Sequence, residues 1–96
     1  MSEQELRSEI IQVGRRLYEI GLVVANSGNL SARLDNENIL ITASGSCLGQ
    51  LEKEDIVKLN LADGKFVGEF KPSSELPLHI LVYKNLDELN LSNSNK

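Results

Sequence analysis

The first twenty residues carry apolar side chains at the spacing of one helix face. The series consists of Leu6, Ile10, Val13, Leu17 and Ile20, and it is widened by Ile11 and Tyr18. Ser2-Glu3-Gln4-Glu5 has the pattern of a capping box, and Gly21 is a natural helix terminator. We therefore predict an amphipathic helix. Gly14, inside it, is unfavourable for a helix and suggests a close packing contact.

The middle of the chain alternates between short apolar runs and turn residues, which predicts two β-hairpins. The runs at 30–34 and 39–42 are separated by Asp35-Asn36-Glu37-Asn38, and the runs at 56–61 and 66–70 by Ala62-Asp63-Gly64-Lys65. In the third run, alternation places Val57, Leu59 and Leu61 on one face. Residues 51–55, between the hairpins, have the length of one helical turn.

A second helix is expected from Ser73 or Ser74 to about Asn85, with Pro77 tolerated in its first turn. The residues expected to form its buried face are Leu78, Leu81 and Val82. From residue 87 to residue 96 the chain is polar with weak periodicity. We therefore expect one domain over residues 1–86 and a disordered tail over residues 87–96.

The predicted order is helix, hairpin, hairpin, helix. Tight turns join antiparallel strands, and a sheet buries its apolar residues against helices. The fold class predicted from this order is α/β, with helices packed on a largely antiparallel sheet.

Composition limits the classes of function. The chain has 96 residues, of which 41% are apolar and 25% charged, with a formal net charge of −4. An acidic chain without a basic cluster is not expected to bind nucleic acid. Cys47 is the single cysteine, which excludes an internal disulfide. Since no apolar run reaches transmembrane length and the N-terminus is unlike a signal peptide, we expect a cytoplasmic protein without a membrane partner.

Three short segments carry the candidate chemistry. They are Ser27-Gly28-Asn29-Leu30-Ser31-Ala32-Arg33, Ile41-Thr42-Ala43-Ser44-Gly45 and Lys71-Pro72-Ser73-Ser74-Glu75. Each offers small hydroxyl or amide side chains beside glycine, proline or a helix start, and such loops bind phosphate through backbone N–H groups. Ordinary turns and helix caps use the same residues, so that interpretation stays open. If the segments bind one phosphate, they must converge in space.

In the order and spacing of these segments, the sequence resembles the class II aldolase/adducin family, from about Leu6 to about Asp87. The resemblance includes Gly21-Leu22-Val23 before the first segment, and Leu78-His79 and Tyr83 after the third. It implies a partial three-layer fold and a phosphate site formed by Gly28, Asn29, Ser44, Gly45, Ser73 and Ser74. It also implies substrates that are phosphorylated sugars or ketoses. Members of the family cleave such substrates by a metal-dependent retro-aldol reaction or epimerise them.

The resemblance also implies that Glu75 is a catalytic acid/base and a ligand of the family's metal, usually zinc. The other zinc ligands in the family are a His-x-His pair and a more distant histidine. Here, residues 89–96 read Leu-Asn-Leu-Ser-Asn-Ser-Asn-Lys, so the pair is absent. We expect a truncated family member that is inactive alone, binds no zinc tightly and self-associates. The alternatives are a non-catalytic adducin-type interaction module and a gene fragment without a function.

Three further residues have competing interpretations. Glu75 is either a catalytic carboxylate or a first-turn acid stabilised by the helix dipole. His79 follows Glu75 by one helical turn and suggests a metal ligand, but we favour a packing or hydrogen-bonding role. Cys47 is expected to be a small loop or core residue, because no neighbouring Lys or His would activate it.

Overall fold

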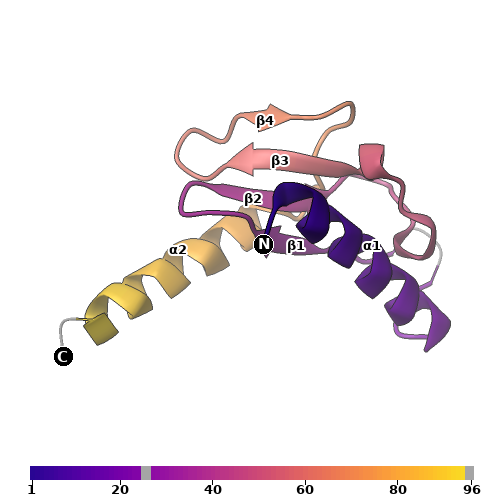
Figure 1. The fold of residues 1–96 in the computed structure, drawn as a ribbon, viewed down its shortest axis with the longest axis horizontal. Coiled ribbons are helices and arrows are strands. Elements are labelled where there is room, and N and C mark those ends of the chain that lie inside the picture. The colour runs from indigo at the N-terminus through magenta and orange to yellow at the C-terminus, as the bar shows by residue number, and fades with distance from the viewer. Residues whose placement is uncertain (25–26, 95–96) are drawn as a thin grey trace.

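The fold comes from a computed structural model that describes residues 1–24 and 27–94, with side chains described as far as residue 87. Within these residues the chain forms two helices and one antiparallel sheet (Figure 1). The elements are α1 (Glu3–Glu19), β1 (Ser31–Arg33), β2 (Asn38–Thr42), the 3-10 turns η1 (Leu48–Gln50) and η2 (Lys53–Asp55), β3 (Ile56–Asn60), β4 (Phe66–Val67) and α2 (Leu76–Ser94). The predicted order of helices and hairpins is confirmed.

The sheet has the strand order β1-β2-β3-β4, so each strand pairs with its neighbour in sequence. Ile41 lies opposite Ser31 on one side and opposite Val57 on the other. At the first turn, the Asp35 carboxylate accepts the N–H groups of Glu37 and Asn38, both at 2.8 Å. These hydrogen bonds, first of all the one from Glu37, lower the pKa of Asp35.

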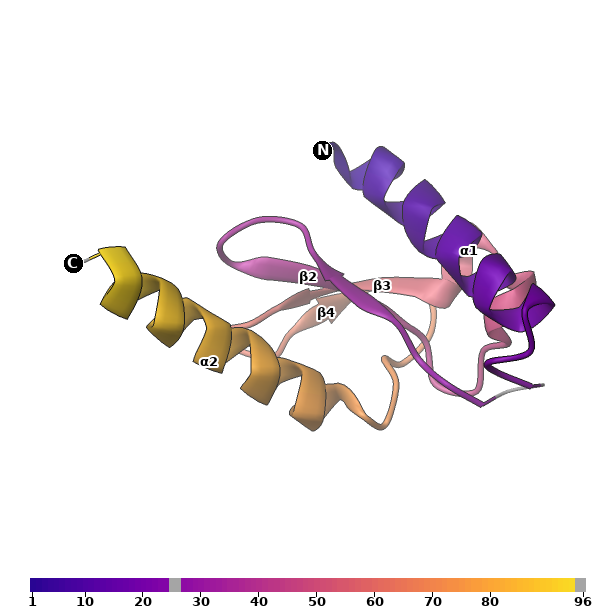
Figure 2. The ribbon, with the colours of Figure 1, turned by 90° about the horizontal axis from the view of Figure 1, so that it is seen from below.

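The two helices cover opposite faces of the sheet, which makes three layers (Figure 2). On the α2 side the buried residues are Ile39, Ile41, Ala43, Val57, Leu59 and Leu61. On the α1 side they are Ile10, Leu40, Leu48, Leu51 and Ile56. Each of the two central strands therefore buries apolar side chains on both faces of the sheet. The predicted three-layer fold and the shared face of Val57, Leu59 and Leu61 are confirmed.

Helix α1 begins and ends as the sequence predicts. The Ser2 hydroxyl accepts the Glu5 N–H at 3.1 Å, and the Glu5 carboxylate accepts the Ser2 N–H at 3.3 Å. At the other end, Gly21 has a φ of 80° and lets the N–H of Leu22 reach the carbonyl of Leu17 at 3.0 Å. Both predicted boundary signals are confirmed.

The apolar face predicted for α1 is wider than the face that the sheet covers. Ile10 is buried, and Leu6, Ile11 and Leu17 pack around it. Val13 and Ile20, placed in the stripe by their spacing, are 47% and 56% exposed. Periodicity gives the direction of a helix face, but the width covered depends on the neighbouring layer.

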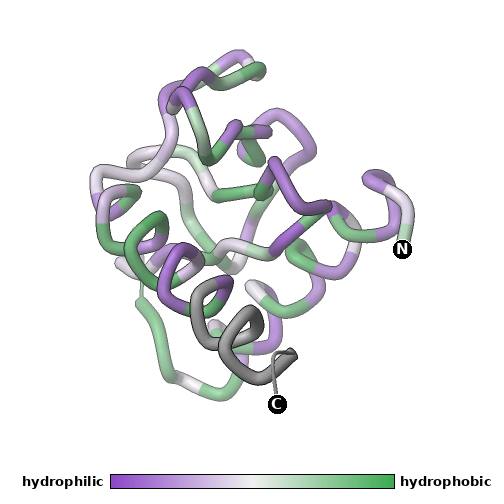
Figure 3. The backbone as a smooth tube through the Cα atoms, turned by 90° about the vertical axis from the view of Figure 1, so that its left-hand side faces the viewer, coloured by the Kyte–Doolittle hydropathy of each residue, from purple (hydrophilic) through white to green (hydrophobic). Residues whose placement is uncertain are grey.

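The buried face predicted for α2 is wrong. Leu78, Leu81 and Val82 are 58%, 57% and 47% exposed. The residues that pack on the sheet are instead Leu76, Ile80 and Tyr83. Figure 3 shows apolar residues around the described part of this helix rather than along one stripe. Because α2 is apolar on more than one side, its pattern could not tell which side meets the sheet.

Helix α2 also has different ends from those predicted. It starts at Leu76, after a turn at Ser74 and Glu75, and continues to Ser94 rather than ending near Asn85. No glycine or proline follows Pro77, so the sequence contains no residue that would stop the helix earlier. The domain boundary at residue 86 and the disorder of residues 87–96 stay predictions.

The close contact suggested by Gly14 is confirmed. A Cβ atom on Gly14 would lie 2.4 Å from the backbone oxygen of Leu48, in turn η1. This distance lies inside van der Waals contact, and a backbone oxygen cannot move as a side chain does. Gly14 therefore lets α1 approach η1.

We predict that Gly14→Ala destabilises the fold by about 1–3 kcal/mol, although alanine favours helices by roughly 1 kcal/mol. Chemical denaturation of both proteins measures the difference. Gln12→Ala, at an exposed position of the same helix, is the control and is expected to leave stability unchanged or slightly raised. A Gly14→Ala protein as stable as Gln12→Ala would contradict the packing explanation.

Candidate functional site

The three segments singled out in the sequence lie side by side, and Thr42, in the second segment at the end of β2, connects it to the first and the third. The N–H of Thr42 donates to the carbonyl of Leu30 at 2.9 Å, and its hydroxyl accepts the N–H of Leu30 at 3.0 Å. Its carbonyl accepts the N–H of Ser73 at 3.0 Å. One residue on, the N–H of Ser44 donates to the carbonyl of Lys71 at 2.9 Å. The three segments therefore lie next to one another, as predicted, while the gathering of their site residues around one ligand stays a prediction.

The loop after β2 is exposed and offers a free donor. Gly45 has a φ of 76°, and its side-chain position faces open space. Its N–H has no acceptor among the residues that the structure describes, and Ser44 beside it is exposed. An exposed N–H next to a hydroxyl can donate to an anion.

The two serines before α2 have different environments. Ser73 is 8% exposed, and its hydroxyl accepts the N–H of Glu75 at 3.1 Å, which is the capping role. Ser74 and Glu75 are exposed, and within the described parts of the chain the Ser74 N–H meets no acceptor. Ser74 is therefore the serine better placed to contact a ligand, while Ser73 shapes the turn.

Gly28 and Asn29 directly precede Leu30, the residue that is hydrogen-bonded to Thr42. Gly28 has a φ of 87°, and a Cβ atom there would lie 3.1 Å from the side chains of Val23 and Leu48. Asn29 is half-buried, and its side-chain oxygen is hydrogen-bonded to Nε2 of His79. The chain thus turns tightly at Gly28 and directs Asn29 toward α2.

His79 is the centre of a hydrogen-bond network that the sequence analysis missed. Its Nδ1 lies 2.6 Å from the hydroxyl of Ser31, which lies 3.0 Å from the hydroxyl of Tyr83. The Arg33 guanidinium lies over the face of the Tyr83 ring, 5.2 Å from its centre, and pairs with Asp87 at 2.9 Å. The available signals were the four-residue spacing of His79 and Tyr83, and the alternation of Asn29 and Ser31.

The surroundings of the His79 ring disfavour its charged form. Burial lowers its pKa below the ordinary value of 6.5, although the negative charge of Glu75 acts in the opposite direction. The favoured expectation of a hydrogen-bonding role for His79 is confirmed by its two ring contacts.

The described residues do not fit a zinc site. A catalytic zinc ion takes about three protein ligands. Among residues 1–24 and 27–87, no three His, Cys, Asp or Glu side chains lie close enough to hold a metal. Glu75 is exposed, and both ring nitrogens of His79 already have partners. The described residues therefore do not form a complete zinc site.

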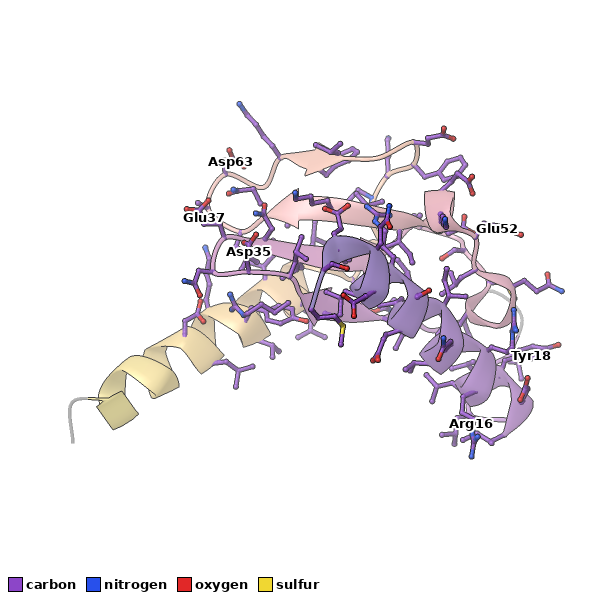
Figure 4. All side chains as sticks on the ribbon, in the orientation of Figure 1. Arg16, Tyr18, Asp35, Glu37, Glu52 and Asp63 are labelled. Carbon is purple, nitrogen blue, oxygen red and sulfur yellow. The ribbon has the colours of Figure 1, made fainter. Side chains whose placement is uncertain are left out.

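Three of the other acidic side chains lie at the far end of the sheet from Glu75. Asp35, Glu37 and Asp63 are at the hairpin turns, at the end of the sheet where β2 begins (Figure 4). The candidate anion site lies where β2 ends, so these carboxylates do not face it.

Cys47 is a free, half-buried cysteine. Within the described ranges, neither helix is long and apolar enough to cross a membrane.

The sequence model of one protein family, the Class II Aldolase and Adducin N-terminal domain, matches residues 8–91. The chain belongs to this family. It is 38% identical over 84 residues to the 3-oxo-tetronate 4-phosphate decarboxylase of Pectobacterium atrosepticum, covering 88% of this chain and 38% of that protein. It is 42% identical to the methylthioribulose-1-phosphate dehydratase of Pseudomonas syringae pv. syringae, covering 86% of this chain and 41% of that protein.

The fold agrees with this assignment. The solved structure of L-fuculose 1-phosphate aldolase superimposes with a TM-score of 0.77 at 32% identity. The match covers 88% of the present chain and 40% of the aldolase chain. The chain thus spans about two fifths of the length of the relatives that it matches.

Protonation of His79 is expected to weaken the fold. Its pKa is lower in the folded chain than the unfolded value near 6.5. Its contribution to stability is therefore complete above about pH 6.5 and is lost as the pH falls from there through the folded pKa. NMR titration of the ring should give a midpoint below 6.5, and thermal unfolding should occur at lower temperature as the pH is lowered.

His79→Gln is the control, because glutamine has no group that titrates in this range. The loss of stability between about pH 7 and about pH 5 should be smaller in this variant. A ring that titrates above 6.5, or an identical pH dependence in the two proteins, would contradict the burial of a neutral histidine.

Proposed function

We propose that this chain is the phosphate-binding portion of a class II aldolase-type enzyme that acts on a phosphorylated sugar or ketose. The observation that carries the proposal is the convergence of the three segments around Thr42, with free N–H donors at Gly45 and Ser74. Anions bind where several N–H groups meet at a helix start. Asn29 adds a side-chain amide to the same region.

The names of the relatives support a shared phosphate rather than a shared reaction. A decarboxylase, a dehydratase and an aldolase are among them, and each name contains a phosphate ester. The reactions of these relatives differ, whereas a phosphate group occurs in the substrate that each name gives. We therefore propose that the portion they share with this chain binds the phosphate. We propose Gly28, Asn29, Ser44, Gly45, Ser73 and Ser74 for this role.

The reaction itself needs groups beyond these. We propose Glu75 as the carboxylate that moves a proton and that contributes one ligand to a metal, as the resemblance implies. Because the described residues do not fit zinc, the chain by itself is proposed to be inactive. A cytoplasmic location and the absence of a nucleic-acid partner stay predictions.

We predict that the isolated chain binds inorganic phosphate weakly, with a Kd on the order of 1 mM, and has no zinc-dependent turnover of a ketose phosphate. Ser44→Ala and Ser74→Ala should each weaken phosphate binding a few-fold, as followed by NMR. Ser8→Ala, at an exposed position on α1, is the matched control. Stoichiometric zinc binding with turnover that Glu75→Gln abolishes would overturn the inactive-portion proposal.

A second candidate function, an interaction module, is favoured by the exposed apolar side of α2. Leu78, Leu81, Val82 and Leu86 are each at least 47% exposed there. Contiguous apolar surface tends to be covered by another protein surface. We propose that in the isolated chain a second copy covers it.

If so, the isolated chain should form dimers or larger species at high concentration, and Leu81→Lys should shift it toward the monomer. Sedimentation velocity over a concentration series measures this. Glu9→Lys, at an exposed position on α1, is the control. It also makes the net charge more positive, but it removes no apolar surface. A monomer at every concentration would reject self-association.

A further inference from the structure

The contact between His79 and Asn29 has a consequence for the donor that Asn29 offers to a ligand. An asparagine side chain carries an acceptor oxygen on one side and an NH2 group with two donors on the other. The ionised oxygens of a phosphate group accept hydrogen bonds and do not donate them. Asn29 can therefore bind phosphate in one of its two amide orientations and not in the other.

The structure contains a feature that selects the orientation. The oxygen of Asn29 faces Nε2 of His79, and an amide oxygen only accepts, so the proton must be on Nε2. In a neutral ring, Nδ1 is then an acceptor, and it lies 2.6 Å from the hydroxyl of Ser31. Burial, which lowers the pKa of His79, supports the neutral ring.

The same reasoning extends to Tyr83. Ser31 donates its proton to Nδ1, so its oxygen is free to accept the Tyr83 hydroxyl at 3.0 Å. Arg33 and Asp87 fix the position of Tyr83 at the outer end. In this arrangement Tyr83 donates to Ser31, Ser31 donates to His79, and His79 donates to Asn29, so each contact is a hydrogen bond with one donor and one acceptor.

We propose that His79 is a positioning residue that holds the side-chain oxygen of Asn29 and so presents its NH2 group to the substrate phosphate. Ser31 and Tyr83 keep the proton of His79 on Nε2. This inference rests on the proposed function, since it assigns a residue to the binding of the phosphate named there. His79 touches no reacting atom in this role.

The first test is the position of the ring proton, which does not depend on any ligand. Long-range 1H–15N NMR spectra of the neutral ring should show the proton on Nε2. A proton on Nδ1 would overturn the proposal, because Nε2 would then accept from the NH2 group of Asn29, and the amide oxygen would face the phosphate.

The second test is a set of inorganic phosphate titrations. Asn29→Ala should weaken binding about tenfold or more, as expected for a lost hydrogen bond to a charged group. His79→Phe, which keeps a ring but no donor, should weaken binding about two- to tenfold. The double variant should bind no more weakly than Asn29→Ala alone, because His79 acts only through Asn29.

The variants include their own controls. His79→Gln keeps an N–H near the position of Nε2 and should bind phosphate better than His79→Phe, which a purely structural role would not require. Asn36→Ala, at an exposed position in the first hairpin turn, should leave affinity unchanged. Circular dichroism of each variant verifies that it is folded. If His79→Phe does not fold, His79→Gln and the proton position still decide the question.

The outcomes separate the two proposals. If the wild-type chain binds no phosphate, the proposed function fails and this inference fails with it. If it binds phosphate and loses it in Asn29→Ala but not in His79→Phe, the proposed function survives and only the positioning role is overturned. Additive losses in the double variant would likewise show that His79 does not act through Asn29.

Discussion

The hydrogen bonds of Thr42 are the constraint on which the candidate site depends. Thr42 is fully buried at the end of a central strand, and it joins Leu30 through two hydrogen bonds and Ser73 through a third. Each contributes on the order of 1 kcal/mol, and a buried group left without its partner costs more. Segments far apart in sequence are thereby fixed to one rigid strand, while the residues beyond their ends stay exposed for a ligand.

The sheet supports this arrangement because its central strands bury apolar side chains on both faces. Such strands need a helix on each side, and α1 and α2 supply them. The two sides differ in how completely they are covered. α1 is fitted closely against turn η1 at Gly14, whereas α2 packs through Leu76, Ile80 and Tyr83 and leaves a second apolar side exposed. The exposed side of α2 is the apolar surface that the sheet leaves uncovered in this chain.

His79 illustrates how a residue type admits several chemistries until its contacts are known. One helical turn after Glu75, it has the spacing of a metal-ligand pair. Its two ring nitrogens are instead used by Asn29 and Ser31, and a histidine with both nitrogens engaged has no lone pair left for a metal. The neutral ring links the helix that follows the third segment to the strand that follows the first.

Local signals in the sequence determined the elements with local causes. The capping box at Ser2, the turn chemistry at Asp35 and the alternation of Val57 and Leu59 each act within a few residues, and each was predicted correctly. The order of the three segments also pointed to the family. Only the tertiary structure decided which side of α2 is buried, that Ser73 faces inward while Ser74 faces outward, and that Ser31 and Tyr83 join His79. These outcomes depend on which surfaces meet across the sheet, and the spacing of residues along the chain carries no information about the surface on the other side.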